Sequence, residues 1–158
     1  MPGFQSVDQQ AQLLAEFEQF ARSGVTADAL MQRISDRVHG LLTRYNWVGF
    51  YLIDKADPQT LVLGPYSGTY TPHERIRLSE GLCGATATTG KTTIVNDVSA
   101  DPRYLMGSEH TKSEIIVPIL VQGHVVAELD VNSYFKNTWD DRQSQFVESC
   151  AALVGRHW

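Results

Sequence analysis

The chain has 158 residues, of which 42% are apolar and 20% are charged, a composition typical of a globular protein with a substantial core. This length predicts a single domain over residues 1–158. The 18 acidic residues outnumber the 13 Lys and Arg residues, and the resulting net charge of −5 argues against nucleic acid as a partner. There is no run of about 18 apolar residues and no signal-like start, which predicts no membrane association and a cytoplasmic location.

Three segments carry apolar residues at helical spacing, and they cover residues 6–24, 26–42 and 138–154. Thr26 and Thr138 are the first residues of the second and third segments, where a hydroxyl can accept a hydrogen bond from the first turn of the helix. The sequence therefore predicts helices at both ends of the chain.

Between these helices the pattern changes to β-branched and aromatic runs separated by turn-forming residues. The predicted strands cover residues 45–53, 60–63, 75–78, 92–95, 113–120 and 125–132, with a short helix-compatible stretch at 81–89. Terminal helices around mostly hairpin-connected strands predict an α+β fold with a central antiparallel sheet. Residues 96–112 form a long connection, and loops of this length in compact domains are usually lids or binding loops.

The two cysteines are predicted to be reduced thiols in different surroundings. Cys83 lies between glycines at a predicted helix start, where the helix dipole stabilises a thiolate and favours reactivity. The alternative is that Cys83 is a small buried apolar residue, as most free cysteines are. Cys150 lies within the apolar stripe of the last helix and is predicted to be a core residue.

One predicted strand carries polar side chains on a single face. Alternation along residues 125–132 puts Glu128, Asp130 and Asn132 on one face and apolar residues on the other. Glu114 lies on the preceding strand, joined by a tight turn, so its carboxylate could converge on the same patch. This face either looks into solvent or lines a polar pocket, where clustered carboxylates require a ligand ammonium, an arginine or a metal ion.

Metal binding requires ligands at a suitable spacing, and none of the candidate residues falls in a compact signature such as His-x-x-x-His. The candidates are His73, Glu109, His110, Glu114, Glu128 and Asp130. The sequence therefore predicts no metal site, and it indicates no other cofactor.

Five motifs occur in order along the chain: NWVGFYL at 46–52, LVLGPYSG at 61–68, GLCG at 81–84, SEIIVP at 113–118 and ELDV at 128–131. This series resembles the free methionine-(R)-sulfoxide reductases, which are small single-domain GAF proteins, and the likeness covers nearly all of the chain. The resemblance implies a GAF fold, in which helices flank a central antiparallel sheet and loops roof a small-molecule pocket. It also implies a homodimer, because GAF domains often pair through their terminal helices.

The resemblance further implies a ligand and a set of pocket residues. In that family an aromatic cage holds the methyl sulfoxide end of free methionine sulfoxide, and acidic residues hold its polar end. The matching positions are the aromatic Trp47 and Tyr51 and the polar Glu114, Asp130 and Asn132, the last without the family's charge. Glu128 stands at a position that is apolar in the family, on the predicted pocket face, where it would favour a more cationic ligand or bind as a neutral acid.

The cysteines depart from the family's pattern. The family's reaction uses attack of a thiolate on the sulfoxide sulfur, followed by a disulfide with a second cysteine. Of up to three family cysteines only that of GLCG is present, as Cys83. His73 and Gly107 stand at the other two positions, and Gly107 replaces the attacking cysteine.

The leading interpretation is a GAF domain that binds a free amino-acid-like molecule, such as methionine sulfoxide, as a non-catalytic sensor or binding protein. One alternative is a working free methionine-(R)-sulfoxide reductase that uses Cys83 with an external thiol reductant. A second alternative is a structural dimerisation module with a vestigial pocket. An enzyme consumes the R sulfoxide, a binding protein only changes its melting temperature with ligand, and a structural module does neither.

Overall fold

The computed structural model describes residues 2–158, with side chains from residue 9 onward. The elements in chain order are α1 (Pro2–Arg22), α2 (Ala27–Leu41), β1 (Trp47–Ile53), β2 (Thr60–Ser67), β3 (Arg75–Arg77), α3 (Gly81–Thr89), β4 (Thr93–Val95), the 3-10 helix η1 (Val98–Ala100), β5 (Ser113–Val121), β6 (His124–Ser133) and α4 (Asp141–Arg156). The strands form one curled sheet in the order β3-β2-β1-β6-β5-β4, and every neighbouring pair is antiparallel. The predicted α+β fold with terminal helices is confirmed.

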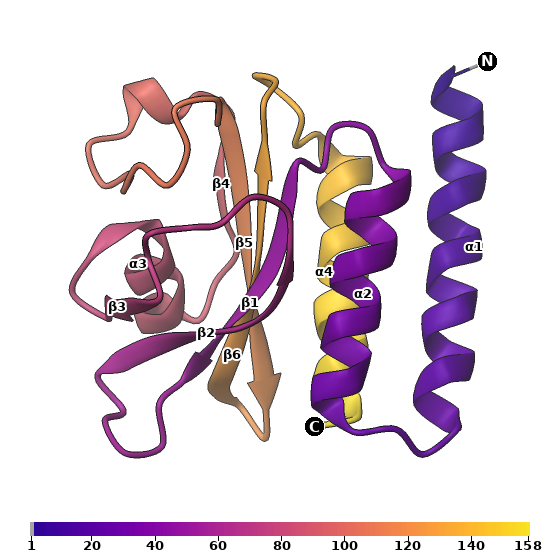
Figure 1. The fold of residues 1–158 in the computed structure, drawn as a ribbon, viewed down its shortest axis with the longest axis horizontal. Coiled ribbons are helices and arrows are strands. Elements are labelled where there is room, and N and C mark those ends of the chain that lie inside the picture. The colour runs from indigo at the N-terminus through magenta and orange to yellow at the C-terminus, as the bar shows by residue number, and fades with distance from the viewer. Residues whose placement is uncertain (1) are drawn as a thin grey trace.

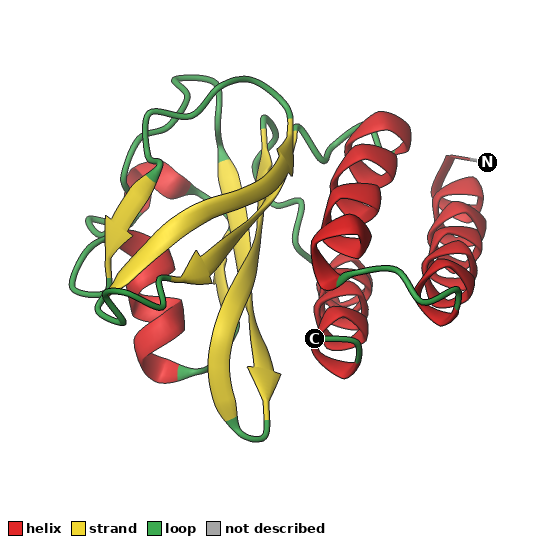
Figure 2. Ribbon diagram, turned by 60° about the horizontal axis from the view of Figure 1, so that its bottom comes forward, coloured by secondary structure: helices red, strands yellow, loops and turns green. Residues whose placement is uncertain are grey.

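Helices cover the two faces of the sheet unequally. α2 and α4 pack against one face, and α1 lies outside them as an outer layer (Figure 1). α3 and the loops that follow β2 and β4 cover the opposite face, as the second view also shows (Figure 2). Within residues 2–158, no helix combines the length and the apolar composition needed to cross a membrane. The sheet therefore separates a helical layer from a layer that is built largely of loops.

Each face of the sheet carries its own apolar core. The larger core lies on the helical side and contains the fully buried Phe17, Ile34 and Leu129. A smaller cluster, which includes Trp47, Tyr51 and Cys83, lies on the other side. The alternation predicted for β6 is present, because its apolar residues enter the larger core while Glu128 and Asp130 lie on the opposite face.

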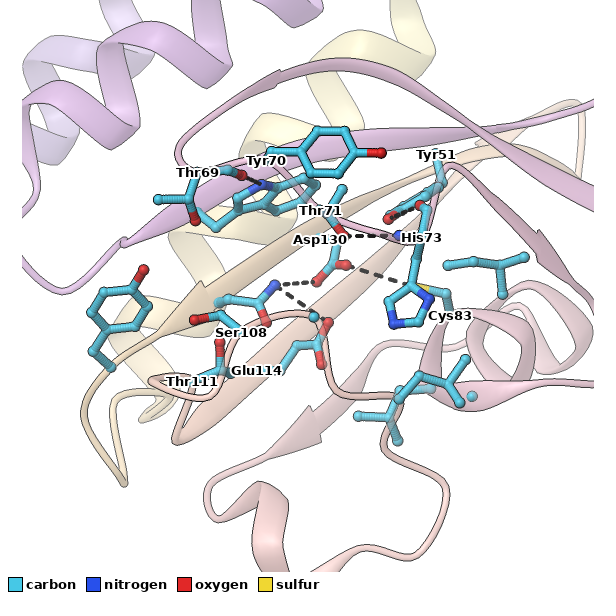
Figure 3. A pocket seen from close by; sticks show the side chains of 18 residues that line it. Tyr51, Thr69, Tyr70, Thr71, His73, Cys83, Ser108, Thr111, Glu114 and Asp130 are labelled. Carbon is cyan, nitrogen blue, oxygen red and sulfur yellow. Dashed lines mark hydrogen bonds between the residues drawn. The ribbon is translucent and has the colours of Figure 1, made fainter.

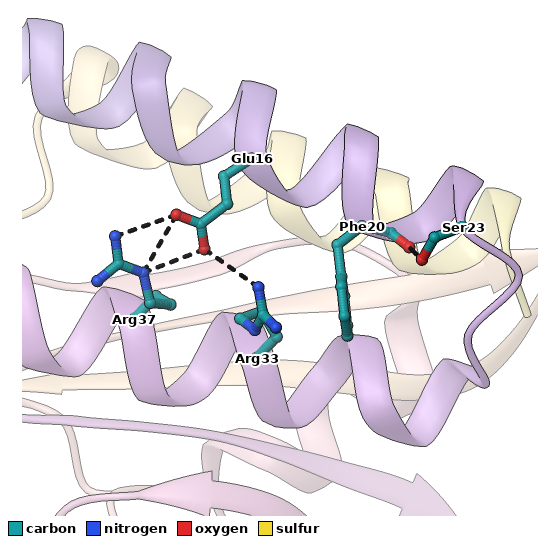
Figure 4. Close-up of polar contacts among 5 residues, drawn as sticks. All are labelled: Glu16, Phe20, Ser23, Arg33 and Arg37. Atoms are coloured by element: carbon teal, nitrogen blue, oxygen red, sulfur yellow. Dashed lines mark hydrogen bonds and ion pairs between the residues drawn. The ribbon is translucent and has the colours of Figure 1, made fainter.

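α1 is held against α2 by one buried aromatic side chain, Phe17, and by a group of surface contacts among Glu16, Arg33, Arg37 and Phe20, which Figure 4 shows. Phe17 is fully buried in the larger core. The Glu16 carboxylate accepts hydrogen bonds from Nε and Nη2 of Arg37 at 3.0–3.2 Å, and it lies 3.7 Å from Arg33. The Arg33 guanidinium lies 3.9 Å from the centre of the Phe20 ring. Because exposed ion pairs contribute about 0–1 kcal/mol, the burial of Phe17 is the larger stabilising contribution.

Two helix starts differ from the sequence prediction. α1 starts earlier than the predicted residue 6. α4 starts after the N-cap Asp140, whose carboxylate accepts a hydrogen bond from a first-turn N–H at 2.9 Å. Thr138, the predicted cap, instead donates to a backbone carbonyl at 3.0 Å in the preceding turn. The predicted cap of α2 is confirmed, since the Thr26 hydroxyl accepts from a backbone N–H at 3.0 Å.

Candidate ligand-binding pocket

A cavity of about 60 Å³ lies on the loop-covered side of the sheet (Figure 3). It is lined by β1, β3, β5 and β6, by the start of α3, and by loop residues before β3, before β5 and directly after β6. The lining residues are Trp47, Tyr51, Thr69, Tyr70, Thr71, His73, Ile76, Gly81, Leu82, Cys83, Leu105, Gly107, Ser108, Thr111, Glu114, Asp130, Asn132 and Tyr134. Pockets for drug-sized ligands measure roughly 300–1,000 Å³, so this cavity suits a compact ligand.

Two aromatic rings from β1 form one wall of the cavity. Trp47 and Tyr51 are four residues apart on one strand and therefore project from the same face. Their ring centres are 6.3 Å apart with an interplanar angle of 28°. Each is fixed by a backbone carbonyl, since Trp47 Nε1 donates to Thr69 O at 3.0 Å and the Tyr51 hydroxyl donates to His73 O at 2.8 Å.

The residue between these two aromatic positions must be small. A Cβ atom at Gly49 would lie 2.4 Å from Cη2 of Trp47 and 2.6 Å from Cβ of Tyr66. Gly49 therefore allows the indole to lie across its own strand and to stack on Tyr66, whose ring centre is 5.5 Å away. The aromatic wall thus depends on the motif as a whole rather than on the two rings alone.

Polar side chains from the β5–β6 hairpin form the floor. Glu114 on β5 is directly opposite Asn132 on β6, and Asp130 is two residues before Asn132 on the same face. The Asn132 amide Nδ2 donates to Asp130 Oδ1 at 3.2 Å and to Glu114 Oε2 at 3.5 Å. Register and pleat therefore bring the two carboxyl groups together, and one amide bridges them.

Both carboxyl groups of the floor are buried, with exposed fractions of 6% for Glu114 and 4% for Asp130. The solvent-facing alternative for this strand face is therefore wrong. Burial raises the pKa of Glu114 well above its ordinary value, and the charge of Asp130 adds to the rise. Burial also raises the pKa of Asp130. A ligand cation would reverse these shifts, because an adjacent positive charge favours the ionised carboxylates.

Glu128 is not among the residues that line the cavity, contrary to the sequence prediction. Its side chain is on the same face as Asp130, but α3 packs over this part of the sheet and the exposed fraction of Glu128 is 0%. Neither carboxylate oxygen has a hydrogen-bond partner among the described residues. Burial raises the pKa of Glu128 well above its ordinary value. Glu128 therefore lies behind the pocket and not in its lining.

Cys83 is the third residue of α3, and its side chain reaches the cavity. It is 6% exposed, and its thiol donates a long hydrogen bond of 3.5 Å to Asp130 Oδ2. Burial raises the pKa of Cys83 well above its ordinary value, and the charges of Asp130 and Glu128 add to the rise. The predicted stabilisation of a thiolate is therefore wrong, because burial and nearby carboxylates outweigh the partial charge at a helix start.

Cys150 lies in the larger core with an exposed fraction of 1%, as the sequence predicts. Burial raises its pKa. Neither thiol of the protein therefore has the electropositive, accessible surroundings of a reactive cysteine.

Gly107 and His73 face each other in the roof of the cavity. A Cβ atom at Gly107 would lie 3.5 Å from Thr71 Oγ1 and 3.8 Å from Cδ2 of His73, which are ordinary contacts. His73 Nε2 donates to the carbonyl of Met106 at 2.8 Å and so ties the two roof segments together. The roof thus brings together the two positions at which the sequence departs from the cysteine pattern of the reductases.

The structure brings together six of the seven side chains that the sequence placed at the site, leaving out Glu128. They are Trp47, Tyr51, Cys83, Glu114, Asp130 and Asn132. Roof residues such as Thr69, Thr111 and Tyr134 were not predicted individually, although Thr111 lies in the long loop that the sequence marked as a binding segment. They are single polar residues in irregular segments, and no periodic pattern distinguishes them from ordinary loop residues.

Comparison with known proteins places this architecture in one family. Residues 26–158 match the GAF domain family. The chain therefore belongs to the GAF domain family.

Within that family the chain is related to free methionine-R-sulfoxide reductases. That enzyme from Saccharomyces cerevisiae is 34% identical over 112 residues, which span 70% of this chain and only 62% of the yeast protein. The structure of the free methionine-R-sulfoxide reductase from Neisseria meningitidis in complex with its substrate is 26% identical, with a TM-score of 0.88, and the match covers 96% of this chain and 89% of that one. A Burkholderia vietnamiensis protein assigned to the GAF sensors is 30% identical, with a TM-score of 0.86 and coverage of 95% and 93%. Relatives in enzyme and sensor classes therefore share this fold.

Proposed function

We propose that this protein binds a small, free amino-acid-like molecule in the pocket and does not convert it chemically. The observation that carries the proposal is the pairing of a buried carboxyl group on β5 with another on β6, opposite an aromatic wall. Such a pocket complements a molecule that has a cationic amine at one end and a polarisable apolar group at the other.

Methionine sulfoxide is the first ligand to test. Its ammonium group would neutralise the charges of Glu114 and Asp130, and its methyl sulfoxide end would lie against Trp47 and Tyr51. The relation to free methionine-R-sulfoxide reductases, one of them determined with its substrate bound, supports this choice. The small volume of the cavity also favours a single amino acid over a peptide.

The number and the surroundings of the thiols in the pocket favour ligand binding over catalytic turnover. Gly107 has no side chain to attack a sulfoxide, although the roof has room for one there. Cys83 lines the cavity, but its pKa is raised by burial and by the neighbouring carboxylates, so the nucleophilic thiolate is disfavoured. A sensor or carrier role, with a partner protein reading the bound state, fits these features.

The alternative is a reductase that uses Cys83, which the position of this thiol in the cavity favours. The Cys83 sulfur would attack the sulfoxide sulfur, take over its oxygen as a sulfenic acid and release methionine. An external thiol would then form a mixed disulfide with Cys83 and release water, and a second external thiol would regenerate Cys83. Each turnover oxidises two external thiols to one disulfide.

A thermal-shift experiment tests binding. Methionine-(R)-sulfoxide, its S epimer, methionine and other free amino acids are added to the purified protein, and we expect at least one to raise the melting temperature. Asp130→Ala should abolish that rise, whereas Glu80→Ala, an exposed acidic residue outside the cavity, should keep it. An unchanged rise in Asp130→Ala would remove Asp130 from the binding site.

A turnover assay separates the three functional classes. We expect no loss of methionine-(R)-sulfoxide with dithiothreitol for the unmodified protein, and measurable loss for Gly107→Cys, which supplies a thiol in the roof. Turnover by the unmodified protein that Cys83→Ser abolishes would instead identify a reductase. A protein that shows neither a melting shift nor turnover would be the structural dimerisation module.

A further inference from the structure

Three potential metal ligands from separate elements meet in the floor of the pocket. They are the thiol of Cys83 on α3 and the carboxyl groups of Glu114 on β5 and Asp130 on β6. One donor atom from each residue lies within 4.8 Å of the other two, and all three residues are buried. Figure 3 shows these side chains pointing toward one another.

The spacing of two of these ligands already matches a tetrahedral zinc site. The Cys83 sulfur lies 3.5 Å from Asp130 Oδ2. With Zn–S near 2.3 Å and Zn–O near 2.0 Å, tetrahedral geometry separates a sulfur from an oxygen ligand by about 3.5 Å. Glu114 would need only a side-chain adjustment to complete the set, since its oxygen is already within 4.8 Å of both partners.

Glu128 gives an independent indication that a cation belongs in this cluster. Its carboxylate is fully buried, and neither oxygen has a hydrogen-bond partner among the described residues. It lies on β6 two residues before Asp130 and on the same face of the sheet, under α3, the helix that carries Cys83. Within residues 9–158, no ion pair supplies a Lys or Arg to Glu114, Glu128 or Asp130. An unpaired buried carboxylate is costly, and a nearby cation would offset that cost.

We propose that Cys83, Glu114 and Asp130 form a binding site for Zn²⁺, with the fourth position open to the cavity. A thiolate ligand selects zinc over magnesium or calcium, which prefer oxygen ligands alone. Cys83 releases its proton to solvent when the metal binds, and Glu128 contributes an additional negative charge behind the ligands. The ion reaches the site through the cavity that all three ligands line. The site shares Glu114 and Asp130 with the proposed amino-acid site, so zinc and a ligand ammonium group would compete for the same carboxyl groups.

Titration of the full chain with Zn²⁺ and Co²⁺ tests the site. The tag-free, chelator-treated and reduced protein is titrated with zinc chloride by calorimetry, and with cobalt chloride by absorption spectroscopy. We expect one equivalent of zinc and, for cobalt, a thiolate-to-metal charge-transfer band in the near ultraviolet. Zinc affinity should rise with pH, because binding displaces the thiol proton.

Matched cysteine variants identify the ligand. Cys83→Ser should lose the charge-transfer band and bind zinc at least about tenfold more weakly, whereas Cys150→Ala should keep both properties. Asp130→Asn provides a second test with Cys83 intact, and we again expect at least about a tenfold loss. Circular dichroism of each metal-free variant verifies that it is folded.

Several outcomes would overturn the zinc site. The first is that the protein binds no zinc. The second is that the zinc affinity is unchanged in both Cys83→Ser and Asp130→Asn, and the third is that the cobalt spectrum lacks the thiolate-to-metal band. A melting shift with methionine sulfoxide in excess chelator would support the proposed function separately, so the two proposals fail independently.

Discussion

At the residue scale, the buried carboxyl groups of Glu114, Glu128 and Asp130 dominate the electrostatics of the pocket side. Burial raises the pKa of each group above its ordinary value. Each therefore holds its proton in the folded chain at pH values where the unfolded chain has already released it. A cation bound in the pocket would exchange with these protons, which makes ligand binding and proton release linked events.

Glu128→Gln should stabilise the protein at neutral and alkaline pH. The amide keeps the shape of the side chain and cannot ionise, so folding at pH 8 no longer has to bury a charge or take up a proton at this position, and we expect a gain of about 1–3 kcal/mol in the free energy of unfolding. Near pH 4 the carboxyl group is protonated in both states, and the gain should disappear. Urea denaturation at the two pH values measures the difference, with the exposed Glu80→Gln as the control that should change little. A loss of stability at pH 8 would mean that the Glu128 charge has a stabilising partner.

Alkylation by iodoacetamide at neutral pH should be slow at both cysteines, because burial raises the pKa of both thiols. We expect Cys83 to react first, since it lines the cavity whereas Cys150 lies in the larger core. Peptide mass spectrometry after limiting alkylation gives the order. Rapid labelling of Cys83, at the rate of an exposed thiol, would contradict the raised pKa and revive the reductase alternative.

At the element scale, the short helix α3 determines what the pocket side of the sheet contains. It covers Glu128, supplies Cys83 to the cavity and joins the strands β3 and β4. Its close packing depends on Gly84, where a Cβ atom would lie 2.6 Å from the carbonyl oxygen of Leu78 and 2.9 Å from that of Arg77. Backbone atoms cannot move aside as a flexible side chain would, so α3 can lie at this depth only with glycine at position 84.

Gly84→Ala should therefore destabilise the protein by about 1–3 kcal/mol, the usual cost of overpacking. Gly40→Ala is the matched control, because Gly40 is exposed on α2 and a Cβ atom there meets nothing within 4 Å. The control should stabilise α2 by about 0.5–1 kcal/mol, as alanine does in a helix. Urea denaturation of both variants measures the contrast. Equal stabilities would show that α3 is not seated on the backbone at residues 77–78.

At the scale of the whole molecule, the helical side and the pocket side of the sheet have different roles. The helical side buries the larger core with its apolar residues from α1, α2 and α4. The pocket side buries a small apolar cluster together with three carboxyl groups. The helical side therefore contains most of the buried apolar residues, whereas the pocket side combines a smaller apolar cluster with buried carboxyl groups, whose burial opposes folding.

Stability of the ligand-free protein should fall as the pH rises above about 4.5. The ordinary values are 3.8 for Asp130 and 4.5 for Glu114 and Glu128, and folding raises all three pKa values. The folded state then binds more protons than the unfolded state, so the free energy of unfolding decreases with pH until the raised pKa values are passed.

Melting temperatures measured from about pH 4.5 to about pH 8 test this slope. The exposed Asp54 does not obscure it, because a hydrogen bond from Arg75 lowers the pKa of Asp54 and its titration ends below this window. We expect a bound amino acid or zinc ion to flatten the decrease. A melting temperature that rises steadily across the window would contradict the raised pKa values of the buried acids.

Much of the pocket could be predicted from the sequence because its positions follow from strand geometry. Trp47 and Tyr51 share a face because they are four residues apart on one strand, and Asp130 and Asn132 do so because they are two apart. A tight turn then brings Glu114 to the same patch. Glu128 lies two residues before Asp130 on the same strand face, so strand alternation predicts it in the pocket as well. Alternation could not indicate that α3 covers Glu128, because the position of α3 over the sheet is determined by tertiary packing.

The sequence by itself determined the order of helices and strands, the apolar face of each strand and the series of motifs typical of its relatives, since each of these is a local or periodic property. Only the tertiary structure decided which polar groups are buried. It brought Cys83 within 3.5 Å of Asp130, although the two residues lie on separate elements, and so raised the pKa of a thiol that local helix geometry alone would activate. The physical reason is that burial and through-space charge depend on what packs over a residue, and neighbouring positions in the chain do not encode this.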